Sequence, residues 1–293
     1  MAATHEDQGL RLTPAYCAVV GGGQMGAGIA HALLLAGAQV VLVERPEAAA
    51  AARDRVVRAV DGSVTRGQLA GAAPLLARLT ISTEMPALGG AALVIEAVPE
   101  DLELKIDTFR RIAAAVAAGT VIASNTSSLS VDLLADAVAH PDRVIGLHFF
   151  NPVPASKLVE VVLGRRTPAE LRSRAEDWVR EWGKTPVTVK NSPGFASSRL
   201  GVAIGLEAIR MLEEGVASAR DIDAAMTLGY GFPMGPLRLT DLVGVDVRLG
   251  VARYLATELG PRFTPPQLMI DMVERGDLGR KTGRGFYDWS EEA

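Results

Sequence analysis

The chain has 293 residues, of which 48% are hydrophobic and 22% charged, and its formal net charge at pH 7 is −4. This composition describes a folded protein of about two domains and excludes the disordered and fibrous classes. The acidic balance argues against a nucleic-acid partner, which requires clustered Lys and Arg. No apolar run reaches the roughly 18–20 residues of a membrane-spanning helix, so we expect no membrane partner either.

Residues 1–14 are mixed and polar, with no apolar stretch, and match neither a signal peptide nor a transit peptide. We interpret them as a flexible tail. The single cysteine, Cys17, can form neither an internal disulfide nor a thiolate zinc cluster, and its apolar neighbours predict a small buried residue. Together these features predict a protein of the reducing cytoplasm.

Strand-like and helix-like segments alternate from residue 15 to about residue 190. The short apolar runs predict strands at 16–20, 39–43, 93–95, 120–123, 144–147 and 157–162. The longer patterns predict helices at 24–36, 48–60, 68–79 and 101–118, the last with Asp101 as its N-cap. Such alternation implies parallel βαβ units, so residues 15–190 are predicted to form an α/β domain.

A turn-rich stretch, residues 191–195, separates this region from a second one. Beyond it only helical patterns occur, at 196–214, 219–228, 237–259 and 267–274. We therefore predict that residues 191–293 form an all-α domain.

A glycine-rich turn follows the first predicted strand. Gly21, Gly23 and Gly26 fit the spacing G-x-G-x-x-G, with a helix directly after them. In a dinucleotide-binding turn, the first glycine permits the tight turn, the second lets the backbone approach a pyrophosphate, and the third lets the helix pack against the sheet. The N-terminus of the helix offers N–H groups to that anion. The pattern predicts a Rossmann-like dinucleotide-binding domain.

An acidic residue, Glu44, ends the second predicted strand, 18 residues after Gly26. A carboxylate at this position accepts hydrogen bonds from the adenosine ribose and repels a 2′-phosphate, which favours NAD over NADP. Arg45 follows directly, and its guanidinium could instead bind a 2′-phosphate. NAD is the expected cofactor, and NADP stays the alternative.

His148 ends the predicted strand 144–147, and Glu160 lies among apolar residues of the next strand. In a hairpin centred near Pro154, these two positions would face each other directly. A buried carboxylate needs a partner, and a His–Glu pair orients the imidazole for proton abstraction. We expect a pair of the kind that an alcohol dehydrogenase without a metal uses; a purely structural hydrogen bond is the alternative.

Ordered motifs covering residues 15–287 resemble the 3-hydroxyacyl-CoA dehydrogenase family, including the 3-hydroxybutyryl-CoA dehydrogenases. They read Gly21-Gly-Gly-Gln-Met-Gly-Ala-Gly28, Val94-Ile-Glu-Ala-Val-Pro-Glu100, Ser124-Asn-Thr-Ser-Ser128, Gly146-Leu-His-Phe-Phe-Asn-Pro152, Lys157-Leu-Val-Glu160, Pro193-Gly-Phe195, Gly231-Phe-Pro-Met-Gly-Pro236 and Gly279-Arg-Lys-Thr-Gly-Arg-Gly-Phe-Tyr287. The resemblance implies an oxidoreductase of fatty acid metabolism with an NAD-binding domain and a helical substrate and dimerisation domain, hence a homodimer.

The resemblance also implies roles for individual residues. His148 would be the general base that removes the substrate hydroxyl proton, with Glu160 as its partner, and Ser127 would contact both substrate and cofactor. The remaining contacts that it implies with the dinucleotide fall on Gln24, Met25, Glu44, Glu100, Lys105, Asn125, Asn151 and Lys281.

One active-site position departs from the family. The family has an asparagine before the Arg-Leu that follows Pro-Gly-Phe, and this chain has Ser198 there. A serine is shorter and donates from one hydroxyl, and the loss of a donor at a reacting oxygen costs roughly 3 kcal/mol. We expect this change to affect which substrate the protein accepts more than the hydride transfer itself.

Three functions are compatible with these features. The first is NAD-dependent interconversion of a short-chain (S)-3-hydroxyacyl-CoA and its 3-oxoacyl-CoA. The second keeps this chemistry but acts on a β-hydroxyacyl unit bound to an acyl-carrier protein, or on a non-thioester hydroxy acid, in a biosynthetic pathway. The third is a dinucleotide-binding protein without catalysis, against which His148, Glu160 and Ser127 argue.

Overall fold

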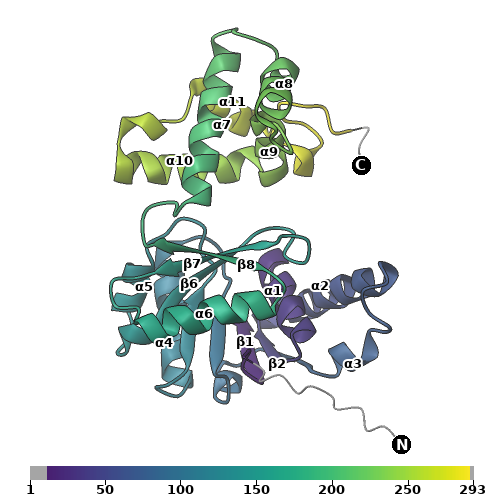
Figure 1. Ribbon diagram of the computed structural model, residues 1–293, viewed down its shortest axis with the longest axis vertical. Helices are drawn as coiled ribbons and strands as arrows, with labels where there is room; N and C mark the ends of the chain where they lie inside the picture. Colours follow the sequence, from purple (N-terminus) through teal and green to yellow (C-terminus); the bar gives the residue numbers. More distant parts are fainter. Residues whose placement is uncertain (1–11, 291–293) are drawn as a thin grey trace, which may run out of the picture. The chain divides into compact units, whose positions relative to one another are not determined.

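The computed structural model describes residues 12–290 and divides the chain into two compact units. The first unit ends at Asn191 and the second begins at Ser192 (Figure 1). Most of the predicted tail lies outside the described residues. Its last part packs on the first unit, where the Trp178 indole N–H donates to the Leu12 carbonyl oxygen at 2.8 Å and Thr13 is buried.

The first unit is built on an eight-stranded sheet in the order β3-β2-β1-β4-β5-β6-β7-β8. Neighbouring strands are parallel except β6 and β7, which form an antiparallel hairpin. The strands are β1 (Tyr16–Val20), β2 (Gln39–Val43), β3 (Leu79–Ser82), β4 (Leu93–Glu96), β5 (Val121–Ser124), β6 (Val144–Phe149), β7 (Leu158–Leu163) and β8 (Thr185–Lys190). This mostly parallel sheet with crossover helices is the predicted Rossmann-like architecture.

Helices cover both faces of the sheet. They are α1 (Gln24–Leu35), α2 (Pro46–Thr65), α3 (Ala73–Leu76), α4 (Leu102–Ala115), α5 (Val131–Asp136) and α6 (Ala169–Glu181), with short 3₁₀ helices η1 (Met85–Leu88) and η2 (Pro141–Arg143). The side chains of Cys17 and Val19 belong to the core that α1, α2 and α6 complete, and α6 lies along the sheet in Figure 1. Helix α4 contacts β4 and β5, and α5 contacts β6. Cys17 is fully buried, which confirms the predicted small buried residue, and burial raises the pKa of its thiol to about 12.

The prediction of one helix over residues 68–79 is wrong. Only the four residues of α3 are helical there, and Leu79 begins the edge strand β3, which pairs with β2. The β3 side chains are half-buried or exposed, so the segment lacks the continuous apolar run that marks an inner strand. Its strand conformation comes from pairing with distant residues, which periodicity does not detect.

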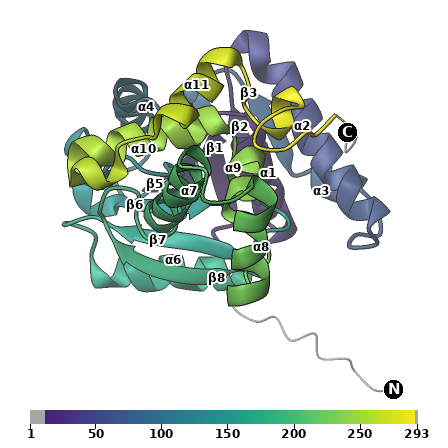
Figure 2. The ribbon, with the colours of Figure 1, turned by 90° about the horizontal axis from the view of Figure 1, so that it is seen from above.

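The second unit is helical, as expected. It contains α7 (Ser197–Glu213), α8 (Ala219–Tyr230), α9 (Pro236–Val243), α10 (Val245–Leu259) and α11 (Gln267–Arg275), with 3₁₀ helices η3 (Pro261–Phe263) and η4 (Arg280–Thr282). Figures 1 and 2 show α7, α9 and α10 side by side. Within residues 12–290, no helix has both the length and the apolar content needed to cross a bilayer.

The prediction of a single helix over residues 237–259 is also wrong, because Gly244 divides this segment into α9 and α10. Gly244 has φ +106 and ψ 124, a conformation far from helical. The N–H of Val245 then donates to the Leu278 carbonyl oxygen at 3.2 Å instead of to a helical partner. The sequence signal was the glycine itself, inside an otherwise continuous apolar pattern.

A buried histidine lies between α1 and α2. His31 is fully buried, its Nε2 lies 3.3 Å from the Ser63 hydroxyl oxygen, and Nδ1 has no hydrogen-bond partner among residues 12–290. Burial, followed by the positive charges of Arg66 and Lys184, lowers the pKa of His31 from 6.5 to about 4. The ring is therefore neutral at pH 7.

This histidine should make the stability of the protein depend on pH. Between pH 4 and 6.5 the ring binds a proton in the unfolded chain but not in the folded one, so stability falls as pH falls through this window. From pH 7 to pH 5, the free energy of unfolding should drop about 2 kcal/mol more in the wild type than in His31→Gln. Urea unfolding at the two pH values measures both drops, and equal drops would contradict the assignment.

Candidate active site

Of the three motif glycines in the turn between β1 and α1, Gly21 and Gly26 have no room for a side chain. Gly21 has φ +98, and a Cβ on it would lie 2.7 Å from the Ala97 carbonyl oxygen. A Cβ on Gly26 would lie 1.8 Å from the Gly21 carbonyl oxygen, which is closer than any two such atoms can approach. These glycines let the turn close and let α1 pack against the strand ends.

The third glycine, Gly23, faces open space. No heavy atom lies within 4 Å of the position that its Cβ would take, and it is the N-cap of α1, with no side-chain hydrogen bond capping the helix. A helix N-terminus without a side-chain cap offers its N–H groups and its partial positive charge to an anion. The residues present therefore fit the pyrophosphate of a dinucleotide.

Glu44 lies at the end of β2 and turns toward the glycine turn. Its Oε2 accepts a hydrogen bond from the N–H of Gly22 at 2.8 Å. The side chain of Arg45 is 77% exposed, and its guanidinium lies 3.1 Å from the Glu47 Oε1 and 3.8 Å from the Glu44 Oε1. The Glu44 carboxylate is therefore held at the turn, with the Arg45 guanidinium beside it.

Gln24 and Met25, the first residues of α1, have different environments. The side-chain amide of Gln24 donates to the Asn151 Oδ1 at 3.1 Å, which joins the glycine turn to the β6–β7 loop. Met25 packs against the hydrophobic core instead. Gln24 therefore lies beside Asn151, another predicted cofactor contact, and Met25 belongs to the core.

His148 and Glu160 face each other across the β6–β7 hairpin, as the spacing about Pro154 predicts. The His148 Nδ1 lies 2.7 Å from the Glu160 Oε2, and both residues are at least 94% buried. The Phe150 ring lies 4.3 Å from the imidazole, centroid to centroid. Because Nδ1 faces the carboxylate, Nε2 is the ring nitrogen directed away from it.

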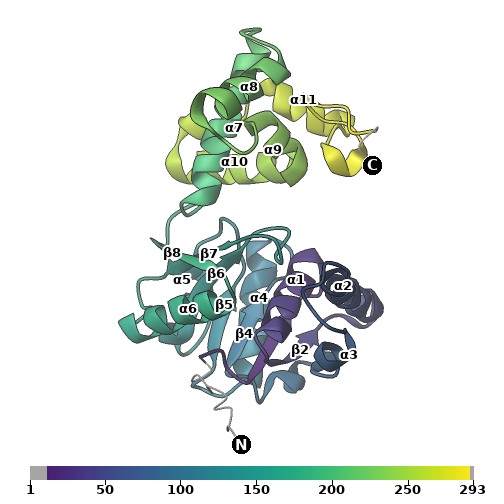
Figure 3. The same cartoon turned by 45° about the vertical axis from the view of Figure 1, so that its right-hand side comes forward.

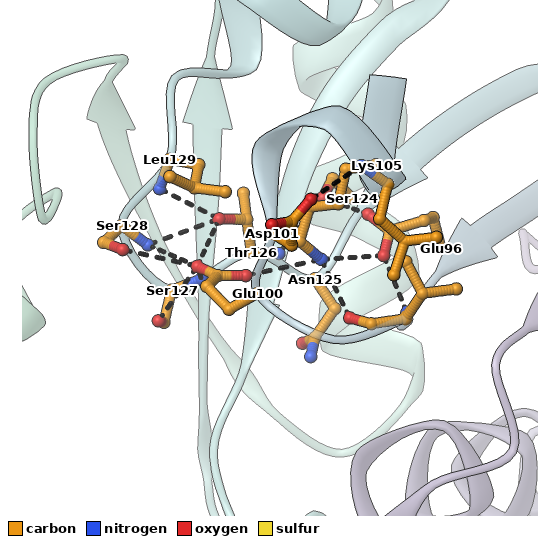
Figure 4. A network of polar contacts seen from close by, with 12 residues as sticks. Glu96, Glu100, Asp101, Lys105, Ser124, Asn125, Thr126, Ser127, Ser128 and Leu129 are labelled. Carbon is orange, nitrogen blue, oxygen red and sulfur yellow. Dashed lines mark hydrogen bonds and ion pairs between the residues drawn. The ribbon is translucent and has the colours of Figure 1, made fainter. Parts of the chain in front are cut away.

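A buried ion-pair network lies at the ends of β4 and β5 (Figure 4). The Lys105 ammonium, on α4, lies 2.7 Å from the Glu96 Oε1 and 3.3 Å from the Glu100 Oε2, and it donates to the Val98 carbonyl oxygen. The Ser124 hydroxyl donates to the Glu96 Oε2 at 2.6 Å. All three ammonium protons thus have acceptors, and Lys105 holds two carboxylates in place.

Glu100 is the anchor of the loop that carries Ser127. Its Oε1 accepts from the backbone N–H of Ser127 at 2.8 Å, from the Thr126 hydroxyl at 2.6 Å, and from the Ser128 N–H at 3.2 Å (Figure 4). Burial would raise the pKa of Glu100, but the Lys105 ammonium and these hydrogen bonds outweigh it and hold the pKa below its ordinary value. The carboxylate is therefore ionised and organises this loop.

Asn125 links the same loop to the histidine strand. Its Oδ1 accepts from the N–H of Phe149 at 2.9 Å, directly after His148. The structure thus brings together the predicted residues Ser127, Glu100, Lys105, Asn125 and His148 at the carboxyl ends of β4, β5 and β6. This edge is where ligands bind in open α/β sheets.

Two predicted site residues, Ser198 and Lys281, belong to the second unit. Ser198 lies half-buried in the first turn of α7. The turn before it contains Gly194 and Phe195, both at positive φ, of 70° and 51°. The Lys281 ammonium pairs with the Asp246 carboxylate at 2.6 Å.

Sequence reasoning missed Glu96 and Ser124 as parts of the site. Glu96 is fully buried at the end of the apolar strand β4, and a carboxylate closing such a run is a signal that could have found it. Ser124 had no comparable signal. Across the described chain, no group of three or more His, Cys, Asp or Glu side chains is arranged to hold a metal ion.

Two family models match nearly all of the chain. One, described as "3-hydroxyacyl-CoA dehydrogenase, NAD binding domain", matches residues 16–192, and the other, described as "3-hydroxyacyl-CoA dehydrogenase, C-terminal domain", matches residues 194–289. The NAD-binding model indicates that the first unit binds NAD(H).

Individual relatives agree with these models. The chain is 39% identical over 281 residues to the 3-hydroxybutyryl-CoA dehydrogenase of Clostridioides difficile, covering 94% of this chain and 99% of that protein. It is 43% identical over 280 residues to the 3-hydroxyadipyl-CoA dehydrogenase of Escherichia coli (strain K12), again over 94% of this chain, but it spans only 59% of that longer protein.

A solved structure supports the same assignment. The (S)-3-hydroxybutyryl-CoA dehydrogenase from Ralstonia eutropha is similar with a TM-score of 0.89 at 41% identity, over 94% of this chain and 99% of that one. Family models over both units, relatives at about 40% identity and this shared fold lead to one conclusion: the chain belongs to the 3-hydroxyacyl-CoA dehydrogenase family.

Proposed function

We propose that this protein is an NAD-dependent dehydrogenase that interconverts a short-chain (S)-3-hydroxyacyl-CoA and its 3-oxoacyl-CoA, with His148 as the general base. The observation that carries the proposal is the buried contact of 2.7 Å between the His148 Nδ1 and the Glu160 Oε2. The relatives support the thioester class, because their names describe dehydrogenases of CoA esters.

The pair provides a path for one proton. The neutral imidazole donates its Nδ1–H to Glu160, and the lone pair of Nε2 takes the proton of the substrate C3 hydroxyl. The carboxylate stabilises the imidazolium that forms and holds the ring orientation. In the reduction direction, the same Nε2 returns the proton to the C3 oxygen.

When bound, NAD would supply the acceptor for the hydride from C3 of the substrate. The glycine turn would hold the pyrophosphate of this cofactor, since the open Gly23 position and the helix N-terminus suit an anion. Glu44 favours NAD over NADP, because its carboxylate lies at the turn and would repel a 2′-phosphate.

Ser127 and Ser198 are the substrate contacts in this proposal. The Ser127 loop is preorganised by Glu100, so a hydroxyl on it meets a reacting oxygen with little reordering. Ser198 donates from a shorter side chain than the family asparagine and leaves more room beside it. We also propose a homodimer through the second unit, where Leu239, Val243 and Val247 are 39–48% exposed.

The test is the oxidation of NADH by acetoacetyl-CoA, with NADPH run alongside and the same acyl group supplied on an acyl-carrier protein. We expect turnover with NADH and CoA to exceed that with NADPH or with the carrier protein by at least tenfold, about 1.4 kcal/mol. A preference for the carrier protein would favour the biosynthetic alternative. Tight NADH binding with no turnover of either thioester would contradict the proposal.

A further inference from the structure

A buried lysine holds the loop that joins β6 to β7. Lys184 directly precedes β8, which lies next to β7 in the sheet (Figure 3). The residue is only 8% exposed, and its ammonium donates to the Val153 carbonyl oxygen at 2.6 Å and to the Ser156 carbonyl oxygen at 2.5 Å. Lys184 therefore ties the start of β8 to two points of this loop.

The loop contains one tight turn, residues 152–156. The N–H groups of Ala155 and Ser156 both donate to the Pro152 carbonyl oxygen at 3.0 Å. The last carbonyl groups of a helical turn have no partner within it, and a cation beside them is favourable. The Lys184 ammonium supplies the donors that the Val153 and Ser156 carbonyl groups need.

This turn packs on α1, the helix whose N-terminus suits a pyrophosphate. Val153 is 2% exposed, and a Cβ on Gly28 of α1 would lie 2.9 Å from the Val153 Cβ. Val153 thus fills the space that Gly28 leaves open. The Asn151 Oδ1, just before the turn, accepts from the side-chain amide of Gln24, the first residue of α1. The turn therefore sets the position of Asn151 at the N-terminus of this helix.

The proton-transfer pair is held by different contacts. His148 and Glu160 are paired within the β6–β7 ladder, outside the turn. Asn151 directly precedes Pro152 of the turn, and consecutive Cα atoms are about 3.8 Å apart, so a shift of the turn moves Asn151. A loosened turn should therefore change the surroundings of the cofactor and leave the pair in place.

We propose that Lys184 is a positioning residue for the cofactor. By holding the turn against α1, it keeps the Asn151 side chain at the helix N-terminus, where the dinucleotide binds. This inference rests on the proposed function, because it takes the N-terminus of α1 as the site of the NAD that this function requires. Lys184 acts through the turn and is not itself a contact of the cofactor.

The test measures the affinity for NADH separately from turnover. In Lys184→Met, the Kd for NADH should rise about 5- to 20-fold, as expected for the loss of one or two hydrogen bonds that fix the site. With acetoacetyl-CoA at saturating NADH, kcat should fall by less than about threefold, because the His148–Glu160 pair is retained. An unchanged Kd would overturn the inference.

Leu88→Ala is the matched control for lost stability. Leu88 is fully buried, so its truncation leaves a cavity and destabilises the same unit. It follows Ala87, whose carbonyl oxygen accepts from Tyr16 at the start of β1, so it lies at the opposite edge of the sheet from the site. The variant should unfold at lower urea but bind NADH within about twofold of the wild type. An equal loss of affinity in Leu88→Ala and Lys184→Met would overturn the inference.

A double-mutant cycle tests whether Asn151 carries the effect. In the Asn151→Ala background, Lys184→Met should raise the Kd for NADH by less than about twofold, because the side chain that it positions is absent. The same factor in both backgrounds would contradict the proposed route.

A second variant acts on the turn from the side of α1. Gly28→Ala places a Cβ against Val153 and leaves Lys184 in place, so it should displace the turn and raise the Kd for NADH as well. If Lys184→Met does not fold and Gly28→Ala binds NADH like the wild type, the inference fails.

NADH titration needs no thioester, so it separates this inference from the proposed function. If acetoacetyl-CoA is not turned over but the Kd for NADH depends on Lys184, the proposed function fails alone. If turnover is as proposed and the Kd does not depend on Lys184, only the positioning role is overturned.

Discussion

Replacement of His148 by alanine should lower kcat by about 10²- to 10⁴-fold, in both reaction directions, while the Kd for NADH stays within about twofold of the wild type. The imidazole is the proposed base, and its Nδ1 lies 2.7 Å from the Glu160 Oε2. The steric fit of the glycine turn depends on Gly21, Gly26 and Ala97. Loss of the ring should therefore remove proton transfer and leave the glycine turn intact.

Two further variants make this result specific. Glu160→Gln keeps the shape of the pair but removes the negative charge that stabilises the imidazolium, so kcat should fall while NADH binding is retained. His140→Ala removes an exposed histidine of the same unit and should leave kcat unchanged. Full activity of His148→Ala would exclude His148 as the base, and a loss of NADH binding would make its role structural.

Replacement of Lys105 by methionine should lower the free energy of unfolding by about 3–5 kcal/mol. The ammonium is 1% exposed and is the cation that Glu96 and Glu100 share. Its removal leaves the fully buried Glu96 carboxylate without a cation and leaves the partly exposed Glu100 carboxylate with the hydrogen bonds of the Ser127 loop alone. Catalysis should fall as well, because Glu100 anchors the loop that carries Ser127. Urea unfolding and the acetoacetyl-CoA assay measure the two effects.

A double variant and a surface control show whether the buried charge is the cause. Adding Glu96→Gln to Lys105→Met removes one uncompensated carboxylate and should restore part of the lost stability, a coupling that independent sites would not show. Arg111→Met removes an exposed arginine of the same helix, 3.9 Å from Asp107, and should change stability by less than about 0.5 kcal/mol. A Lys105→Met protein as stable as the wild type would contradict the role of the network.

The elements that the sequence determined by itself are those whose signals are local. The G-x-G-x-x-G spacing predicts the turn because glycine is needed for steric reasons within a few residues, and Asp101 caps α4 by accepting from the N–H of Leu104 three residues later. The pairing of His148 with Glu160 is also local, since a hairpin about Pro154 places them opposite each other through the strand period of two.

Other features depend on contacts between segments that lie far apart in the sequence, and only the tertiary structure shows them. β3 is a strand because β2 pairs with it, and Glu100 organises the Ser127 loop across 27 residues of chain. In the sequence, Arg248 is one more charged residue of a helical pattern. In the structure, Gly201 and Gly205 of α7 lie beside its side chain, and the residue is only 9% exposed. Burial and charge compensation depend on which distant segments pack together, and neither composition nor periodicity within one segment contains that information.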